Sequence, residues 1–428
     1  MKKTRQSLSA LGLVLMLLVT ACKPGAGTAE PTAAPTTAPT AAPTTQSEDV
    51  AVPTEITMGD PNEPVTVVAA ETPGVCTASP LPELPVRVAD ETDYVKGASL
   101  ETAEMVIYEY SDFQCPGCSG MSTVVDMLLE ENPGIALVYR HFPLSFHALA
   151  QIAAEATEAA GAQGKFWEMH DMLFGNTNSW TSLTPETIRP VLTGYAEALD
   201  LDVEAFNAAL DNGTFTEKVK AQNDEAMELR LPGTPSFIFD NVLFPSDIGL
   251  SLQGMEAFRT IIKDRDKIFY AEPPAMTVAV EDTYEAVLKT SKGDMRVNLL
   301  TASAPANVNS FIFLANENWY DGADFFYVQD GFVAVTGDPT NSTVGYPGYT
   351  CEGETQGVFD RAGLVGMFGN GQFFFTLGAD AARLSGQFSL IGQVVEGLDV
   401  LDALARRAVG DSSAPAADVL ETVEIIEK

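Results

Sequence analysis

Between about residue 80 and residue 270, short apolar runs alternate with longer segments whose apolar residues recur near a period of 3.6. The apolar run 104–110 predicts a strand, and the segment 119–132 after it predicts a helix. A second apolar run, 136–144, predicts another strand. We then expect helices over 147–174, 184–199, 202–210 and 214–229, two strand-like pieces over 231–244, and a closing helix over 254–269. This order predicts an α/β domain with a helical insertion at 81–270.

The pattern changes after a linker that we place at 271–282, where two adjacent prolines, Pro273 and Pro274, cannot continue a helix. Short β-prone runs separated by glycines dominate the rest of the chain. We expect a hairpin over 284–301, helices over 304–320 and 397–407, a final strand over 419–427, and short strands over 324–328, 331–338, 364–369, 372–378 and 387–395. Many short strands with two helices predict an all-β closed barrel at 283–428.

The first 80 residues contain no such periodicity. Residues 1–21 begin with a basic stretch, continue with an apolar run too short to span a bilayer, and end before Cys22. The stretch LVTAC resembles a bacterial lipoprotein signal, which implies cleavage before Cys22 and acylation of its thiol. The alternative is an ordinary signal peptide with a chance cysteine. Residues 22–80 are rich in Ala, Pro and Thr, which predicts a disordered tether.

The net charge and the export signal indicate which partners and which location to expect. The formal charge of −35 opposes binding to nucleic acid. An export signal followed by a lipid-modified cysteine predicts a protein anchored to a membrane of the cell envelope, on its extracytoplasmic side. Disulfides persist in that environment, so cysteine pairs become informative.

Cys115 and Cys118 lie two residues apart in CPGC, and three explanations are open. A structural zinc site needs four ligands, and the chain has no second CxxC. A structural disulfide across two residues would close a very small loop and stabilise little. A redox pair is favoured by the context, because a predicted strand delivers Cys115 to the start of a predicted helix, where the helix dipole favours a thiolate. Pro116 is well tolerated at such a helix start.

A carboxyl group precedes the pair by six residues. Glu109 lies on the strand 104–110, which should be buried. A buried carboxyl has a raised pKa and could relay a proton to a thiol. The alternative, of equal weight, is a solvent-facing strand residue.

The sequences EYSDFQCPGC, RHFPLSFHALA, GKFWEMHDMLF and LPGTPSFIF together resemble the DsbA-like branch of the thioredoxin superfamily. The resemblance implies a thioredoxin fold in which Cys115 attacks, Cys118 resolves, and Pro235 is a cis-proline beside them. It also implies that Thr234, Pro235, Pro116 and Gly117 bind substrate. The Pro-Gly dipeptide lacks the histidine of the best-known oxidants, which argues against a very oxidising potential.

The chain has three histidines, His141, His147 and His170. His141 and His147 lack a third ligand for a metal, so packing is the favoured explanation for both. Packing is also the favoured explanation for His170. We therefore expect no metal and no cofactor.

The C-terminal pieces GDMRVNLLTASAPANVNSFIFLA, DGADFFYVQDGFVAVTGDP, GQFFFTLG and LSGQFSLIGQVVEGLDVLDAL resemble cyclophilin-type prolyl isomerases. The resemblance implies a slot for a proline ring. Its residues here are Tyr327, Phe332, Val333, Val335, Gln372, Phe374, Leu384 and Phe388.

Several of these positions depart from the family pattern. Tyr327 stands where the family has its catalytic arginine, Val335 where it has a glutamine, and Phe388 where it has a histidine. An oxyanion-type donor typically contributes 10²–10³ in rate, so we expect weak or no isomerase activity. The apolar residues of the slot remain, which favours binding of proline-containing segments.

Cys76 and Cys351 complete the cysteine inventory. A bridge between them would join the two domains across a long loop, and free thiols are the alternative.

The sequence thus predicts a thiol–disulfide oxidoreductase that acts on unfolded or thiol-containing exported proteins, with a membrane partner for reoxidation. An active prolyl isomerase with an accessory redox domain and a non-enzymatic surface chaperone are the alternatives.

Overall fold

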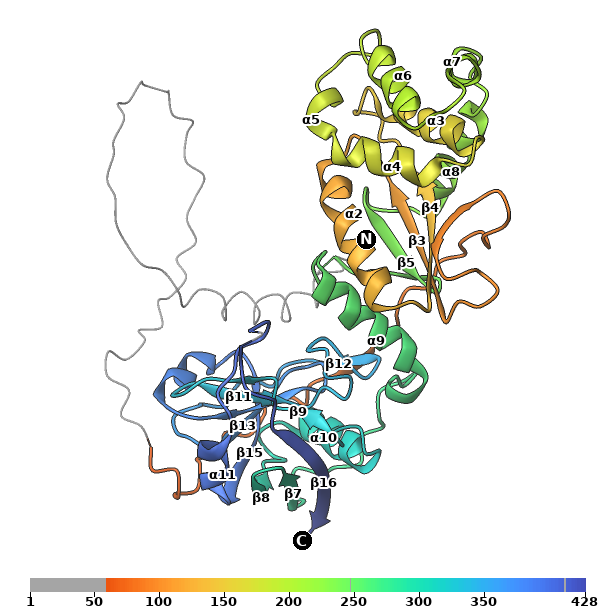
Figure 1. Cartoon of the computed structure of the whole chain (residues 1–428). Helices are drawn as coiled ribbons and strands as arrows, with labels where there is room; N and C mark the ends of the chain where they lie inside the picture. Colours follow the sequence, from red (N-terminus) through yellow and green to blue (C-terminus); the bar gives the residue numbers. More distant parts are fainter. Residues whose placement is uncertain (1–58, 247, 412) are drawn as a thin grey trace, which may run out of the picture.

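The computed structural model describes residues 59–246, 248–411 and 413–428 and contains two bodies (Figure 1). The upper body carries α2 to α9, and the lower body carries the strands β7 to β16. The predicted signal peptide 1–21 and the lipidation site Cys22 lie outside the described residues. Among the described residues, no helix combines the length and the apolar character needed to cross a membrane.

The upper body is built on a five-stranded sheet in the order β2-β4-β3-β5-β6. β3 and β4 are parallel, and the other pairs are antiparallel. The strands are β2 (Tyr94–Gly97), β3 (Met105–Ser111), β4 (Ile135–His141), β5 (Ser236–Phe239) and β6 (Val242–Leu243). Ile107 and Leu137 pack against α2 (Pro116–Glu131) and α9 (Leu252–Ile268) on one face of this sheet. Alternation along the strands therefore directs Glu109 and Ser111 to the same face.

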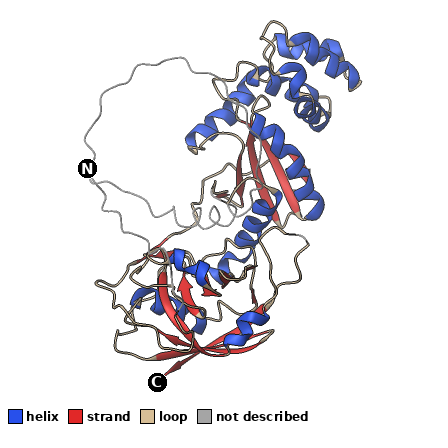
Figure 2. Ribbon diagram, turned by 90° about the vertical axis from the view of Figure 1, so that its left-hand side faces the viewer, coloured by secondary structure: helices blue, strands red, loops and turns tan. Residues whose placement is uncertain are grey.

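A block of helices stands at one end of the upper sheet, as the blue helices at the top of Figure 2 show. It comprises α3 (Ala150–Gly161), α4 (Phe166–Gly175), α5 (Thr177–Trp180), α6 (Arg189–Ala198), α7 (Val203–Asp211) and α8 (Thr216–Glu228). The single helix expected over 147–174 is wrong. A turn at 162–165 breaks it, because Gly164 adopts a φ of 76° that ends the helical geometry.

The lower body contains one nine-stranded sheet in the order β10-β11-β14-β13-β15-β8-β7-β16-β9. Its strands are β7 (Tyr284–Thr290), β8 (Gly293–Leu299), β9 (Ala323–Asp324), β10 (Tyr327–Val328), β11 (Val333–Thr336), β13 (Leu364–Met367), β14 (Phe373–Thr376), β15 (Ser389–Glu396) and β16 (Val419–Glu427). Residues of this sheet pack in one core with α10 (Pro305–Asn316) and α11 (Leu398–Ala403), and η1 (Ala379–Leu384) is a 3₁₀ helix.

The expected closed barrel is wrong, because the sheet curls but stays open. Its two edge strands, β9 and β10, are two residues long and do not pair with each other. Only Phe325 and Phe326 separate them in the chain. Such short edges leave too few ladder hydrogen bonds to seal the sheet.

The last part of the predicted tether, 59–80, is ordered on the lower body. The guanidinium of Arg361 donates to the carbonyl oxygens of Asp60 and Glu63 at 3.1 and 3.0 Å. The side chain of Gln393 accepts from Val65 N at 2.9 Å and donates to Glu63 O at 2.7 Å. The backbone of this segment therefore gains partners far away in the sequence, which its composition did not reveal.

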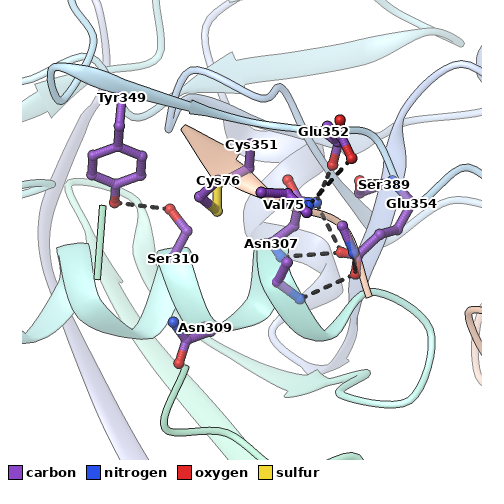
Figure 3. Close-up of a disulfide and its surroundings, with 12 residues drawn as sticks. Val75, Cys76, Asn307, Asn309, Ser310, Tyr349, Cys351, Glu352, Glu354 and Ser389 are labelled. Carbon is purple, nitrogen blue, oxygen red and sulfur yellow. Dashed lines mark hydrogen bonds between the residues drawn. A yellow bond between two sulfur atoms is a disulfide. The ribbon is translucent and has the colours of Figure 1, made fainter. Parts of the chain in front are cut away.

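A short strand and a disulfide close this attachment (Figure 3). β1 (Cys76–Ala78) pairs antiparallel with β12 (Tyr349–Cys351), and Cys76 is disulfide-bonded to Cys351. Beside them, the buried carboxylate of Glu354 accepts from Gly74 N and from the first amides of α10. A helix N-terminus stabilises such a negative charge, so this carboxylate joins the N-terminal segment to the lower body.

Both ends of the upper body meet the same loop of the lower body. Ser79 N donates to Gly348 O at 2.7 Å, and Tyr270 N donates to Pro347 O at 2.9 Å. The hydroxyl of Tyr346 donates to Ser79 O at 3.1 Å. The upper body is therefore held at its entry and its exit, like a domain inserted into the lower one.

We predict that replacing Cys76 and Cys351 together by serine lowers the free energy of unfolding by about 2–5 kcal/mol, because the bridge closes a long loop of the unfolded chain. Denaturant unfolding under non-reducing conditions measures the change. The double variant Cys115→Ser/Cys118→Ser is the matched control and should lose much less. Equal losses in the two variants would contradict the prediction.

Candidate functional site

The CPGC sequence lies at the connection between β3 and α2 and continues into the first turn of α2. Cys115 is the N-cap residue of α2, and Pro116 occupies its first turn. Both cysteines are free thiols, Cys115 partly exposed and Cys118 fully buried. Cys118 lies one turn into the helix, where its sulfur accepts from Asp112 N at 3.5 Å.

The two thiols have opposite acidities. Hydrogen bonding to Cys118, to Thr234 and to backbone amides at the helix start lowers the pKa of Cys115 to about 5, although partial burial opposes this. Burial, followed by the hydrogen bond to Cys115, raises the pKa of Cys118 far above its ordinary value. At neutral pH the pair therefore holds its negative charge on the accessible sulfur.

A second loop faces the pair. The Thr234–Pro235 peptide bond is cis, and the thiol of Cys115 lies 3.4 Å from Thr234 O. A Cβ atom added to Gly117 would lie 3.3 Å from Pro235 Cδ and 3.6 Å from Cys115 Sγ. The residues that the resemblance assigned to substrate binding therefore lie together around the exposed sulfur.

Glu109 is buried, with 2% of its surface exposed, so the solvent-facing alternative is wrong. Burial raises its pKa to about 7, the nearby Ser111 lowers it, and the charge of Asp126 raises it further. Its Oε1 has no hydrogen-bond partner among the described residues. Glu109 can therefore gain or lose a proton near neutral pH.

The three histidines each contact a carboxylate rather than one another. His141 Nε2 lies 3.1 Å from Glu158 Oε1, His147 Nδ1 lies 2.8 Å from Asp112 Oδ2, and His170 Nδ1 lies 2.8 Å from Asp171 Oδ1. Within the described ranges, no group of three metal-ligating side chains comes together.

Sequence reasoning missed Asp112, which shapes the loop before Cys115. Its buried carboxylate accepts from Gln114 N at 2.7 Å, from Leu144 N at 2.9 Å and from His147. The side-chain amide of Gln114 in turn donates to Thr181 O. The signal was an acidic residue between the apolar strand and the cysteines, in SDFQC.

Most residues of the expected proline slot gather in a hydrophobic cluster that is separate from the main core of the lower body. Seven of the eight form one cluster in which each is at most 7% exposed: Tyr327, Phe332, Val333, Val335, Phe374, Leu384 and Phe388. Gln372 is the exception, because its amide donates to Thr343 O and Gly345 O at 3.2 and 2.9 Å.

Two further side chains cover this cluster and were not singled out from the sequence. The guanidinium of Arg383 lies 3.9 Å above the ring centre of Phe332. The ring of Phe368 lies 5.2 Å from that of Phe374 and 5.1 Å from that of Phe388. The hydroxyl of Tyr327 bonds to Gln329. The slot residues therefore contact other side chains of the chain itself.

Two family models match separate parts of the chain. Residues 90–264 match the model described as thioredoxin, and residues 286–426 match the model described as cyclophilin type peptidyl-prolyl cis-trans isomerase. These two regions correspond to the upper and lower bodies.

Curated relatives share only part of their length with this chain. A Na(+)/H(+) antiporter NhaA 1 of Salinispora arenicola is 40% identical over 157 residues, which are 36% of this chain and 22% of the relative. A peptidyl-prolyl isomerase CWC27 of Cryptococcus neoformans is 35% identical over 138 residues, 29% of this chain and 27% of the relative. The chain thus spans about a quarter of the length of the curated relatives it matches.

Solved structures resemble each body. BdbD from Bacillus subtilis is 16% identical, with a TM-score of 0.35, covering 44% of this chain and 99% of that one. A cyclophilin type isomerase of Cryptosporidium parvum is 23% identical, with a TM-score of 0.31, covering 34% and 99%. From the two family models, the chain joins a thioredoxin-like domain to a cyclophilin-like domain.

Proposed function

We propose that the thioredoxin-like domain is a thiol–disulfide oxidoreductase that forms or reshuffles disulfides in exported proteins. The observation that carries the proposal is the unequal pair of thiols. An accessible sulfur with a lowered pKa stands next to a buried sulfur with a raised one. A stable thiolate is a good leaving group in disulfide exchange, so this arrangement favours oxidation or isomerisation of a bound client.

The proposed oxidation is balanced in two steps. A client thiolate attacks Cys115 Sγ of the Cys115–Cys118 disulfide, which forms a mixed disulfide and releases the Cys118 sulfur as an anion that takes up a proton. A second client thiolate then attacks the client sulfur of the mixed disulfide and releases Cys115 as a thiolate. The client loses two electrons and two protons, and the CPGC pair gains the electrons. A membrane redox partner would reoxidise the pair.

Glu109 supplies the proton that the buried Cys118 sulfur needs. Its pKa of about 7 allows it to be protonated and deprotonated at ambient pH. Thr234 and Pro235 hold the client as an added strand beside β5, with Pro116 and Gly117 lining the same surface.

The cyclophilin-like domain, in this proposal, binds proline-containing segments of the same client with weak or no isomerase activity. Its cluster offers apolar and aromatic surface, while the arginine position is Tyr327, whose hydroxyl cannot replace a guanidinium fork. An active isomerase and a non-enzymatic chaperone remain the alternatives. The envelope location and the lipid anchor at Cys22 rest on the sequence signal alone.

Thiol exchange tests the proposal directly. We expect the full chain to oxidise a reduced dithiol peptide, Cys115→Ser to lose this activity, and Cys118→Ser to accumulate a Cys115–peptide mixed disulfide, because no resolving thiol remains. Thiol trapping with peptide mapping across a glutathione redox series measures it, with Cys76–Cys351 as an internal structural reference. A Cys115–Cys118 disulfide that opens only in strong reductant would contradict the proposed function and favour the non-enzymatic chaperone alternative.

The raised pKa of Glu109 predicts a pH-dependent stability cost. Because the folded carboxyl has a pKa of about 7 against an ordinary 4.5, folding binds a proton between these values and stability falls as pH rises through them. Above pH 7, the free energy of unfolding of Glu109→Gln should therefore exceed that of the parent by up to about 3 kcal/mol, and the difference should shrink toward pH 4.5. Denaturant unfolding over a pH series measures it. Glu130→Gln, which neutralises an exposed carboxyl on α2, is the matched control. A difference that does not vary with pH would contradict the buried, raised carboxyl.

The covered slot predicts how peptides bind. Arg383→Ala should raise the affinity for a proline-containing peptide a few-fold, because it removes a cation–π contact of about 0.5–1 kcal/mol from the Phe332 ring. Arg406→Ala, a surface arginine paired with Asp330, is the control. Peptide titration followed by nuclear magnetic resonance measures binding, and a coupled peptide assay measures prolyl turnover. Turnover well above the uncatalysed rate that survives Cys115→Ser would favour the isomerase alternative.

A further inference from the structure

Four polar side chains lie together under α2, on one face of β3 and β4. Glu109 is in register with Tyr139, and Ser111 is in register with His141. Each is at most 2% exposed. One atom of each has no hydrogen-bond partner among the described residues: Glu109 Oε1, Ser111 Oγ, Tyr139 Oη and His141 Nδ1.

Such a concentration of unsatisfied atoms is costly. A buried polar atom without a partner costs about 1–3 kcal/mol, and native structures satisfy nearly all of them. Internal water commonly bridges about three such groups in a polar interior. Four unsatisfied atoms on neighbouring strand positions therefore call for a shared role.

The inner end of this group meets the buried thiol. The Sγ atom of Cys118 accepts from the amide of Asp112, the residue that follows Ser111. Ser111 precedes Asp112 directly in the chain and lies two residues after Glu109 on the same strand, so the strand places it between the contact to Cys118 and the carboxyl. The register of β3 with β4 places Tyr139 beside Glu109 and His141 beside Ser111, so the polar group begins next to the buried thiol.

The outer end reaches the surface through an unbroken set of contacts. His141 Nε2 lies 3.1 Å from Glu158 Oε1, and Glu158 Oε2 accepts from Lys218 Nζ at 2.7 Å and from the Tyr94 hydroxyl at 3.2 Å. The side chain of Lys218 is 27% exposed. Burial alone would raise the pKa of Glu158, but His141 and Lys218 lower it, so Glu158 remains an acceptor.

We propose that Tyr139 and His141 form a water-bridged proton relay that connects the Cys118 sulfur, through Ser111 and Glu109, with Glu158 and Lys218 at the surface. The inference rests on the proposed function and deepens it. When a client thiolate opens the Cys115–Cys118 disulfide, the Cys118 anion takes the proton of Glu109. The relay then returns a proton from solvent to the Glu109 carboxylate, while the electrons stay on the two sulfurs.

Other charged groups face the same interior and define a competing path. Lys96 and Asp126, paired at 2.6 Å, act on the pKa of Glu109 from β2 and α2. The remaining neighbours are engaged elsewhere: Asp112 with backbone amides and His147, and His170 with Asp171. A variant in the Lys96–Asp126 pair therefore shows whether protons reach Glu109 by this path or by the path through Glu158 and Lys218.

The phenol of Tyr139 allows the sharpest test. Because its hydroxyl has no partner among the described residues, Tyr139→Phe should leave stability unchanged or slightly increased. We expect this variant to slow single-turnover oxidation of a dithiol peptide by about tenfold or more, which is less than the 10²–10⁴-fold typical of a direct general acid or base, because Tyr139 acts through other groups. Its redox equilibrium with glutathione should stay as in the parent, because a relay changes a rate and not an equilibrium. Stopped-flow tryptophan fluorescence over a pH series follows the reaction.

Histidine variants supply an independent test. His141→Gln keeps a polar atom near Glu158, whereas His141→Asn keeps one near the Nδ1 position, and neither can titrate. Both should slow the reaction and alter its pH profile. His170→Gln is the matched control, because His170 is buried in the same aromatic cluster, 5.1 Å from the Tyr139 ring, but bonds to Asp171. Lys96→Met should leave the rate nearly unchanged.

The outcomes separate the relay from the proposed function. A parent chain without thiol exchange contradicts the proposed function itself. A parent that exchanges normally, with Tyr139→Phe and both His141 variants equally fast, overturns only the relay. A slow step in Lys96→Met or His170→Gln comparable to that in Tyr139→Phe also overturns it. Should the His141 variants fail to fold, Tyr139→Phe decides alone.

Discussion

The pairing of β1 with β12, closed by the Cys76–Cys351 bridge, fixes how the two domains are joined. Because of it, a segment that precedes the thioredoxin-like domain in the chain belongs structurally to the cyclophilin-like domain. Ser79 and Tyr270 then reach adjacent positions of one loop, so the inserted domain is anchored at both ends. Two anchors restrict rotation between domains far more than a single linker such as 271–282 would.

Within the inserted domain, unequal burial creates the chemistry. α2 starts at Cys115 and runs across the sheet face that carries Glu109, so its first turn is accessible while Cys118, one turn later, is covered. The helix start and the neighbouring donors stabilise charge on the first sulfur, and burial removes it from the second. Under the proposed function, the burial that raises the pKa of Cys118 calls for a proton supply, which the polar groups of β3 and β4 would provide.

The sequence motifs indicated the thiol pair and the Thr234–Pro235 loop, which lie together in the structure, because each depends on local spacing that a family pattern retains. Seven of the eight residues predicted for the proline slot share one cluster, while their role stays a prediction. The strand pattern around Glu109 also indicated burial, but it could not exclude the opposite face. What the sequence did not reveal depends on distant partners. Residues 59–80 are ordered by Arg361 and Gln393, some 300 residues away, and the sheet stays open because its two edge strands are too short, which hydrophobic patterning does not measure. The break at Gly164 requires a positive φ that a helical periodicity hides.

The placement of the two proposed sites limits the kind of client that could use both. Cys115 lies at the end of the sheet beside the helical block, where Gln114 bonds to Thr181, whereas α9 leads from the opposite side into the cyclophilin-like domain (Figure 1). Simultaneous binding adds avidity only if the intervening chain spans the distance between the sites. A compact folded client presents its thiols and prolines on a fixed surface and cannot adapt to that distance. An extended chain reaches roughly 3.3 Å per residue, so an unfolded segment can adjust its span by adding residues. Under the proposed function, the double attachment would therefore favour clients that have not yet folded.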